Sequence, residues 1–162
     1  MKAPIVVVGI GEMAGVFTRG LLRLGHPVFP VTRNSDMEAE ARALAEPALV
    51  LVAVGEKDLH PTLERIPDAW RDSLGLLQNE LLPRDWEAHG LEQPTVISVW
   101  FEKKKGQDFK VLVPSPAFGP AAPLLESALE TLGIPAWELA DRDELLFELV
   151  RKNVYILTTN IA

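Results

Sequence analysis

The 162-residue chain contains no cysteine, only three histidines and no excess of positive charge. The absence of cysteine excludes disulfide bonds, thiolate zinc sites and a cysteine nucleophile. The formal net charge of −7 argues against a general nucleic-acid-binding role, because that role needs a basic face to neutralise phosphates. The histidines, His26, His60 and His89, lie in separate predicted loops without ligand spacing, so we predict no metal site.

The chain also lacks a hydrophobic run long enough to span a bilayer. The apolar N-terminal run is short and interrupted by glycines, and no secretory cleavage pattern follows it. We therefore expect a cytoplasmic protein without a membrane partner. A composition of 48% hydrophobic and 24% charged residues is typical of one globular domain of this length.

Strand and helix patterns alternate along most of the chain. Continuous apolar runs at residues 4–10 and 48–54 predict strands buried on both faces, and residues 13–25 carry apolar side chains at helical spacing. A hairpin is predicted around residues 104–108, and the proline-containing stretch 114–120 is interpreted as a rigid loop. The alternation predicts a doubly wound α/β fold.

The stretch VVVGIGEMAG near the N-terminus holds the main ligand-binding motif. Gly9 and Gly11 form a G-x-G pattern between a predicted strand and a predicted helix, where backbone N–H groups can bind a pyrophosphate. Glu12 and Met13 open the helix, and Ala14 takes the third motif position, where a small residue keeps helix and strand close. A tight glycine corner without a ligand is the alternative.

The end of the second predicted strand discriminates between cofactors. A cofactor with a free ribose 2′-hydroxyl usually meets an acidic residue there, but this chain has Arg33 followed by Asn34. An arginine can pair with a 2′-phosphate, and Asn34 can add a hydrogen bond. The pattern favours NADP (NADPH) over NAD; a solvated surface arginine is the alternative for Arg33.

From Asp141 onward the sequence indicates one long helix. Asp141 is the expected N-cap, and Glu144 completes a capping box. The helix is apolar on more than one face, and such a helix needs a cover. We therefore divide the chain into residues 1–140, a dinucleotide-binding domain, and residues 141–162, which we expect to begin a helical domain that is missing here or to form an oligomer interface.

Three segments together resemble the ketopantoate reductase (2-dehydropantoate 2-reductase) family. They are residues 6–33 with the glycine turn and the arginine, the stretch GLLQNELL at residues 75–82, and residues 141–162, which are similar to the helix that opens the family's second domain. The resemblance covers nearly the whole chain as the N-terminal part of such proteins. It implies a Rossmann-type, mostly parallel sheet and an NADPH-dependent oxidoreductase that transfers a hydride to a 2-keto acid or related carbonyl.

The resemblance also assigns roles to single residues. Lys152 matches the family's general acid, Asn160 a substrate-binding asparagine, and Asn79 the asparagine near the nicotinamide ribose. Positions 152 and 160 share one helical face. Desolvation can lower the pKa of a lysine on such an apolar helix, which suits an acid catalyst near neutrality. The alternative is that Lys152 lies along the core with its amine in water.

Four residues depart from the family pattern and support a second hypothesis. Ile156 replaces another substrate-binding asparagine, Glu80 replaces the glycine of the family's Gln-Asn-Gly, and Gly55 stands where many members have a lysine. Glu12 adds a negative charge beside the expected phosphates. The second hypothesis is a catalytically inactive Rossmann-like interaction module. For either hypothesis we expect a homo-oligomer built on residues 141–162, and for the first a small-molecule carbonyl substrate.

Overall fold

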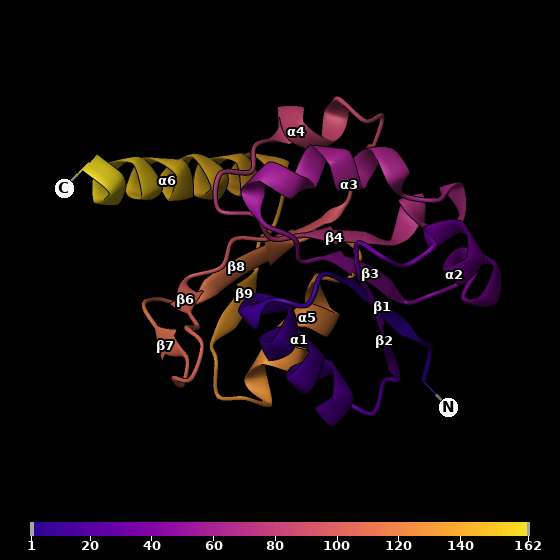
Figure 1. Cartoon of the computed structure of the whole chain (residues 1–162). Helices are drawn as coiled ribbons and strands as arrows, with labels where there is room; N and C mark the ends of the chain where they lie inside the picture. The colour runs from indigo at the N-terminus through magenta and orange to yellow at the C-terminus, as the bar shows by residue number, and fades with distance from the viewer. Residues whose placement is uncertain (1, 162) are drawn as a thin grey trace.

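A seven-stranded sheet forms the centre of the computed structural model, which describes residues 2–161 and the side chains up to Thr159 (Figure 1). Its strands lie in the order β2-β1-β3-β4-β5-β8-β9, and β6 and β7 form a separate two-stranded sheet. The strand bounds are β1 Ile5–Val8, β2 Val28–Val31, β3 Leu49–Val52, β4 Leu74–Leu76, β5 Thr95–Ile97, β6 Phe101–Glu102, β7 Lys110–Val111, β8 Ser115–Phe118 and β9 Ala136–Glu138.

Helices cover both faces of the sheet (Figure 1). Helices α1 and α5 lie together on one face, and α3 and α4 lie on the other. The bounds are α1 Glu12–Arg23, α2 Met37–Ala43, α3 Leu59–Arg65, α4 Pro83–Glu87, α5 Ala122–Glu130 and α6 Arg142–Ile161, with 3-10 helices η1 Glu56–Asp58 and η2 Asp68–Ser73. The doubly wound α/β prediction is therefore confirmed.

The sheet is mostly parallel, and its strand order reverses at β1. Strands β1 to β5 pair in parallel, β8 pairs antiparallel with β5, and β9 pairs in parallel with β8. Strand β1 lies between β2 and β3, so the crossovers from β1 and from β2 leave in opposite directions. In open α/β sheets, ligands bind outside the carboxyl ends of the strands at such a switch point.

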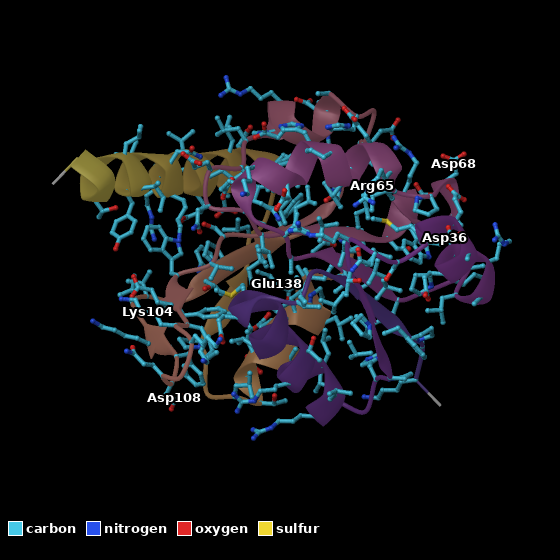
Figure 2. The ribbon with its side chains drawn as sticks, in the orientation of Figure 1. Asp36, Arg65, Asp68, Lys104, Asp108 and Glu138 are labelled. Carbon is cyan, nitrogen blue, oxygen red and sulfur yellow. The ribbon has the colours of Figure 1, made fainter. Side chains whose placement is uncertain are left out.

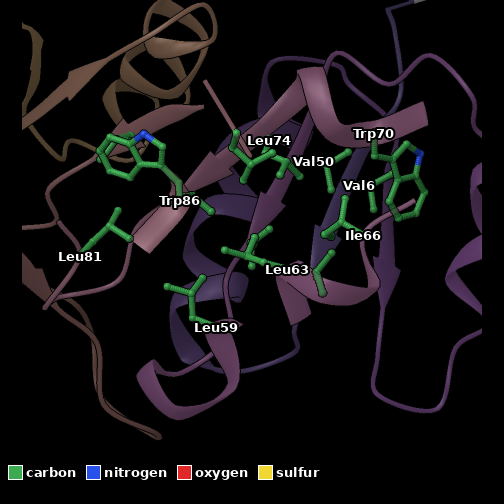
Figure 3. Packing of buried hydrophobic residues seen from close by; sticks show 14 of the residues in the cluster. Val6, Val50, Leu59, Leu63, Ile66, Trp70, Leu74, Leu81 and Trp86 are labelled. Carbon is green, nitrogen blue, oxygen red and sulfur yellow. The ribbon is translucent and has the colours of Figure 1, made fainter. Parts of the chain in front are cut away.

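The central strands are buried on both sides, which explains their continuous apolar sequence. Val6 faces the layer of α3 and packs in one cluster with Leu63 and Trp70 (Figure 3). Val7 points to the opposite face and packs with Phe17 of α1. Burying one such aliphatic side chain contributes roughly 1.5 to 3 kcal/mol to folding, so the two layers hold the strand ends firmly in place.

Helix α1 is fixed by a close approach to α5. A Cβ atom on Gly20 would lie 2.4 Å from the carbonyl oxygen of Ala128, so only glycine fits this crossing. The crossing sets the position of α1 and therefore of the glycine turn that precedes it.

The hairpin prediction is confirmed, but the expected loop over residues 114–120 is wrong. Strands β6 and β7 pair across residues 104–108, while residues 115–118 form β8 inside the main sheet. Pro116 made this stretch look like a loop, because proline cannot donate to a strand ladder. Its carbonyl still accepts from the N–H of Ser98 at 2.9 Å, so β8 lacks only the donor of one residue.

Helix α6 begins where the capping pattern predicts. The N–H of Glu144 donates to Asp141 Oδ1 at 2.9 Å, and Glu144 Oε2 accepts from the N–H of Ala140 at 2.8 Å. The helix extends beyond the rest of the chain (Figure 1). One side is buried through Leu145 and Leu149. The other carries an exposed apolar row, called here the outer stripe: Leu146, Phe147, Val150, Val154 and Leu157.

Candidate functional site

The turn after β1 requires glycine at its first position. Gly9 has φ +115°, and a Cβ there would lie 2.7 Å from the carbonyl oxygen of Ala53. Its N–H donates to the carbonyl of Val31 at 2.9 Å, which ties the turn to the end of β2. The loops after β1, β2 and β3 therefore meet at one edge of the sheet.

The second glycine leaves the N-terminus of α1 open. Gly11 is the N-cap of this twelve-residue helix, and no side chain caps the first turn. A Cβ on Gly11 would meet nothing within 4 Å, so ligand atoms can approach the backbone there. Met13 is partly buried and Ala14 fully buried against the sheet. The free N–H groups and the helix dipole together suit an anion such as a phosphate.

Glu12 is partnered rather than directed into the open space. Its Oε2 atom lies 3.1 Å from Lys103 Nζ, which comes from the β6–β7 hairpin. The lysine amine also donates to the carbonyl of Lys104 at 2.9 Å. Lys103 therefore offsets the negative charge that made Glu12 an objection to phosphate binding.

A pocket of about 750 Å³ opens at this edge of the sheet. Its floor is formed by the ends of β1, β2 and β3, and its rim includes both glycines of the turn, Arg33, Asn34 and Gly55. The volume lies in the usual range of small-molecule and cofactor sites. The structure thus brings the predicted glycines, Arg33 and Asn34 to one pocket.

The loop after β2 holds its shape through its own hydrogen bonds. The N–H of Thr32 donates to Ser35 Oγ at 3.0 Å, and the N–H of Asn34 donates to Thr32 Oγ1 at 3.3 Å. Arg33 is exposed at this turn and forms no ion pair within the described part of the chain. Its guanidinium is consequently available to an anionic ligand.

Gln78 holds the loop after β3 in place beside the pocket. Its buried Nε2 atom donates to the carbonyl oxygens of Val52 at 2.8 Å and Val54 at 3.0 Å. The bonds join the end of β4 to the loop after β3, which lines the pocket. Sequence reasoning passed over this residue, although an amide inside the apolar run LGLLQN is a local signal for it.

Lys152 lies in a different, buried environment. Only 6% of the residue is exposed. Its Nζ atom donates a hydrogen bond to the carbonyl of Val99 and lies 4.4 Å from the ring centroid of Trp100 and 6.0 Å from that of Tyr155. Burial lowers the pKa of Lys152 to about 8. The amine is thus held by a carbonyl and an aromatic face, not extended into water.

Two acidic side chains act electrostatically on this lysine, and one of them also binds the turn after β4. The carboxylates of Glu102 and Glu56 act on Lys152 in the direction that raises its pKa, against the larger effect of burial. Glu56 Oε1 accepts from the N–H of Glu80 at 3.1 Å, beside the exposed Asn79. Burial raises the pKa of Glu56 itself. Neither Lys152 nor Asn79 lines the pocket of the glycine turn.

Two further expectations concern Asn160 and the histidines. Asn160 lies on the last turn of α6, and its side chain is outside the described residues. His60 lies in α3 rather than in the expected loop; its Nδ1 lies 2.8 Å from Nε2 of His89, which follows α4, and its Nε2 lies 3.3 Å from Oδ1 of Asp85 in α4. Among residues 2–161 no three histidine, aspartate or glutamate side chains are arranged to hold a metal ion.

No described helix combines the length and apolarity needed to cross a membrane.

Sequence comparison identifies no relatives: no family model and no curated protein matches this chain. Solved structures share its fold. A PanE/ApbA family ketopantoate reductase from Ralstonia eutropha is similar with a TM-score of 0.57 and 16% identity, over 85% of this chain and 57% of that one. The dimeric ketopantoate reductase from Staphylococcus aureus gives 0.60 and 12%, over 88% and 62%. Synechocystis arogenate dehydrogenase gives 0.58 and 17%, over 85% and 59%.

This likeness establishes a Rossmann-type fold shared with ketopantoate reductases and other dehydrogenases. At 12% to 17% identity it concerns the fold alone. The chain spans about three fifths of the length of these proteins, 57% to 62%.

Proposed function

We propose that this chain is the NADP(H)-binding domain of a ketopantoate-reductase-like oxidoreductase that reduces a 2-keto acid or related carbonyl. One observation carries the proposal: the uncapped N-terminus of α1 and the free guanidinium of Arg33 meet at the same pocket. One end of that pocket can take a pyrophosphate and the other a phosphorylated ribose. The shared fold with ketopantoate reductases supports the same assignment.

The pocket residues fit the cofactor in shape and in charge. Gly9 allows the turn to pass close to the Ala53 carbonyl, Gly11 leaves the backbone at the start of α1 open, and Lys103 offsets the charge of Glu12 beside it. NADPH, when bound, would supply the hydride for the carbonyl carbon. The role of the chain is to bind and orient it through Gly9–Ala14, Arg33 and Asn34, with Asn79 toward the nicotinamide ribose.

For Lys152 we propose the role of general acid toward the carbonyl oxygen. A pKa of about 8 lies close to neutrality, where proton donation and proton recovery are both efficient. The Val99 carbonyl accepts one of the three ammonium protons and the Trp100 ring lies beside the amine, so the ammonium is held in one position with other N–H groups left to donate. Asn160 follows Lys152 by about two turns of α6 on the same helical face, and we propose that it binds the substrate.

We further propose that residues 141–162 form an interface between two copies of the chain, distinct from the cofactor-binding residues 1–140. The outer stripe runs from Leu146 to Leu157, roughly 17 Å along the helix. On an ordinary protein surface exposed apolar side chains are scattered singly, whereas here they form a continuous row, which is typical of an interaction site. The dimeric state of the Staphylococcus aureus neighbour is consistent with such pairing.

A direct binding experiment tests the cofactor proposal. Titration with NADPH and with NADH is followed by energy transfer from the four tryptophans to the reduced nicotinamide. The chain should bind NADPH more tightly than NADH. Arg33→Ala should weaken NADPH binding by about 1.5 to 3 kcal/mol and leave NADH nearly unchanged, because a charge-assisted phosphate contact is removed. Absence of binding at millimolar NADPH would overturn the proposal.

The second candidate function is a Rossmann-like interaction module without catalysis. The engagement of Lys152 by Val99 and Trp100, outside the glycine-turn pocket, favours it, as does Ile156 at a substrate position. This candidate predicts a stable dimer that binds neither NADPH nor NADH. A dimer that binds NADPH and reduces keto acids would exclude it.

A further inference from the structure

One face of α3 forms the outer wall of the glycine-turn pocket. Pro61, Thr62 and Arg65 line the pocket, and the spacing of three and four residues places Arg65 on the same side of the helix as the other two. Asp58, which directly precedes the helix, lines the pocket as well. Thr32–Asn34 of the loop after β2 line the same pocket. Arg65 therefore contributes to the same pocket as Arg33, from a separate element.

The position of Arg65 along this wall identifies the end of the pocket that it serves. Asp58 follows directly after the loop of β3, and Arg65 lies seven residues further, about 10 Å along the helix. Arg65 also borders a neighbouring cleft lined by Ser35 and Asp36, which follow Asn34 in the chain. It therefore lies on the Arg33–Asn34 side of the pocket, away from the acidic Asp58. Figure 2 shows Arg65 at α3, remote from Lys104 and Asp108 of the hairpin.

Both guanidinium groups are without ionic partners in the part of the chain that the structure describes. Arg33 and Arg65 are exposed, and neither lies within 4.0 Å of a carboxylate. This holds although Asp36 and Asp68 border the adjoining cleft (Figure 2). Among the residues that line the pocket, these two arginines outnumber the single acidic residue, Asp58, although the adjoining cleft also carries Glu38 and Glu64. Such a pair is suited to a dianionic group.

We propose that Arg65 is a specificity residue that binds the 2′-phosphate of the cofactor's adenosine together with Arg33. The inference rests on the proposed NADP(H) function. It adds to the expected cofactor-binding residues one that lies outside both the glycine turn and the loop after β2. A planar guanidinium can donate two parallel hydrogen bonds to phosphate oxygens, so two arginines from separate elements of one pocket can bind the same terminal phosphate. Thr62, which is buried, lies one turn before Arg65 and lines the same pocket.

Two nucleotide fragments test the inference on the intact chain. Adenosine 2′,5′-bisphosphate carries the proposed phosphate, and adenosine 5′-phosphate lacks it. Their dissociation constants are measured by isothermal titration for the wild type, Arg65→Ala, Arg65→Lys and Arg42→Ala. Arg42 is the matched control: it is exposed and borders the neighbouring cleft, but it does not line the glycine-turn pocket.

The expected result is specific for the 2′-phosphate. Arg65→Ala should weaken the bisphosphate roughly tenfold and change the monophosphate less than about twofold; Arg65→Lys should lie between, because it keeps the charge and loses the paired donors. Arg42→Ala should match the wild type. Equal loss of both fragments would overturn the inference, since Arg65 would then act on the base or the 5′-phosphate. Unchanged binding in Arg65→Ala would also overturn it. Failure of the wild type to bind either fragment would instead contradict the NADP(H) function itself.

Discussion

The glycine-turn pocket and helix α6 adjoin the same sheet but differ in how completely this chain surrounds them. All the residues that line the pocket, including both glycines, Arg33 and Arg65, come from residues 8–65. Helix α6 packs Leu145 and Leu149 against the sheet and leaves the outer stripe exposed, with Phe147 64% and Val154 53% accessible. The pocket is lined by several elements, whereas no other part of the described chain covers the apolar side chains of the stripe.

This difference separates two kinds of experiment. Changes at the pocket should alter ligand binding while leaving the fold and the oligomeric state unaffected. Changes on α6 should alter stability or association while leaving nucleotide binding unaffected. The following variants are ordered from the largest expected effect to the smallest.

Gly11→Ala should abolish most cofactor binding without unfolding the chain. A Cβ there meets no protein atom within 4 Å and the backbone is extended, so the fold tolerates it, but the methyl group fills the space needed by the pyrophosphate. Loss of two charge-assisted hydrogen bonds corresponds to about 3 kcal/mol of binding free energy. NADPH titration and thermal unfolding measure the two effects. Normal NADPH affinity in this variant would contradict the assignment of the turn.

Lys152→Met should stabilise the chain at neutral pH. Burial holds the pKa at about 8, below the unfolded value of 10.5, so the folded state carries a charge it disfavours at every pH below 8. The wild type should therefore gain stability as the pH rises from about 8 to 10.5, by at most about 3 kcal/mol, and Lys152→Met should lack this gain. Urea unfolding across that range measures it.

If Lys152→Met were instead less stable at pH 7, the ammonium would be a net structural contact of Val99 and Trp100. The proposed catalytic role would then lose its physical basis, because a lysine whose charged form stabilises the fold would not have a lowered pKa.

Gly20→Ala should destabilise the chain by about 2 kcal/mol, because the added methyl group meets the Ala128 carbonyl and forces α1 away from α5. Gly15→Ala is the matched control in the same helix. Its Cβ would meet nothing within 4 Å, so it should stabilise by about 0.5 to 1 kcal/mol through helix propensity. Chemical denaturation compares the two. Similar effects for both would mean that the α1–α5 crossing does not constrain the glycine turn.

Val150→Glu combined with Val154→Glu should change association more than stability. Both side chains are exposed on the outer stripe, so the loss in unfolding free energy should stay within about 1 kcal/mol. Light scattering should show a dimer for the wild type and a monomer for the double variant. Leu22→Glu, at an exposed leucine of α1, is the control and should remain dimeric. A monomeric wild type would contradict the proposed interface.

Local sequence patterns were sufficient for most elements of the fold. Continuous apolar strands, the spacing of Gly9 and Gly11, and the Asp141 cap depend on neighbouring residues, so sequence alone predicted them. Strand β8 was missed because Pro116 removes a ladder donor, which sequence rules count against a strand. Its pairing with β5 and β9 compensates.

The candidate site was only partly predictable for a related reason. Glu12 and Lys103 are 91 residues apart, and Lys152 is 53 residues from the Val99 carbonyl that it binds. No local pattern connects such pairs. Arg65 likewise lines the pocket with Arg33 although the two residues are far apart in the sequence and come from α3 and the loop after β2.

Amide chemical-shift mapping with NADP⁺ tests the central claim most directly. The 162-residue chain is of a size that gives a resolved amide spectrum, and each backbone N–H reports separately. We expect saturable shifts to concentrate at residues 9–14, at Arg33–Asn34 and from Asp58 to Arg65. We expect no saturable shift on the outer stripe. The absence of shifts at millimolar NADP⁺, or shifts confined to α6, would contradict it.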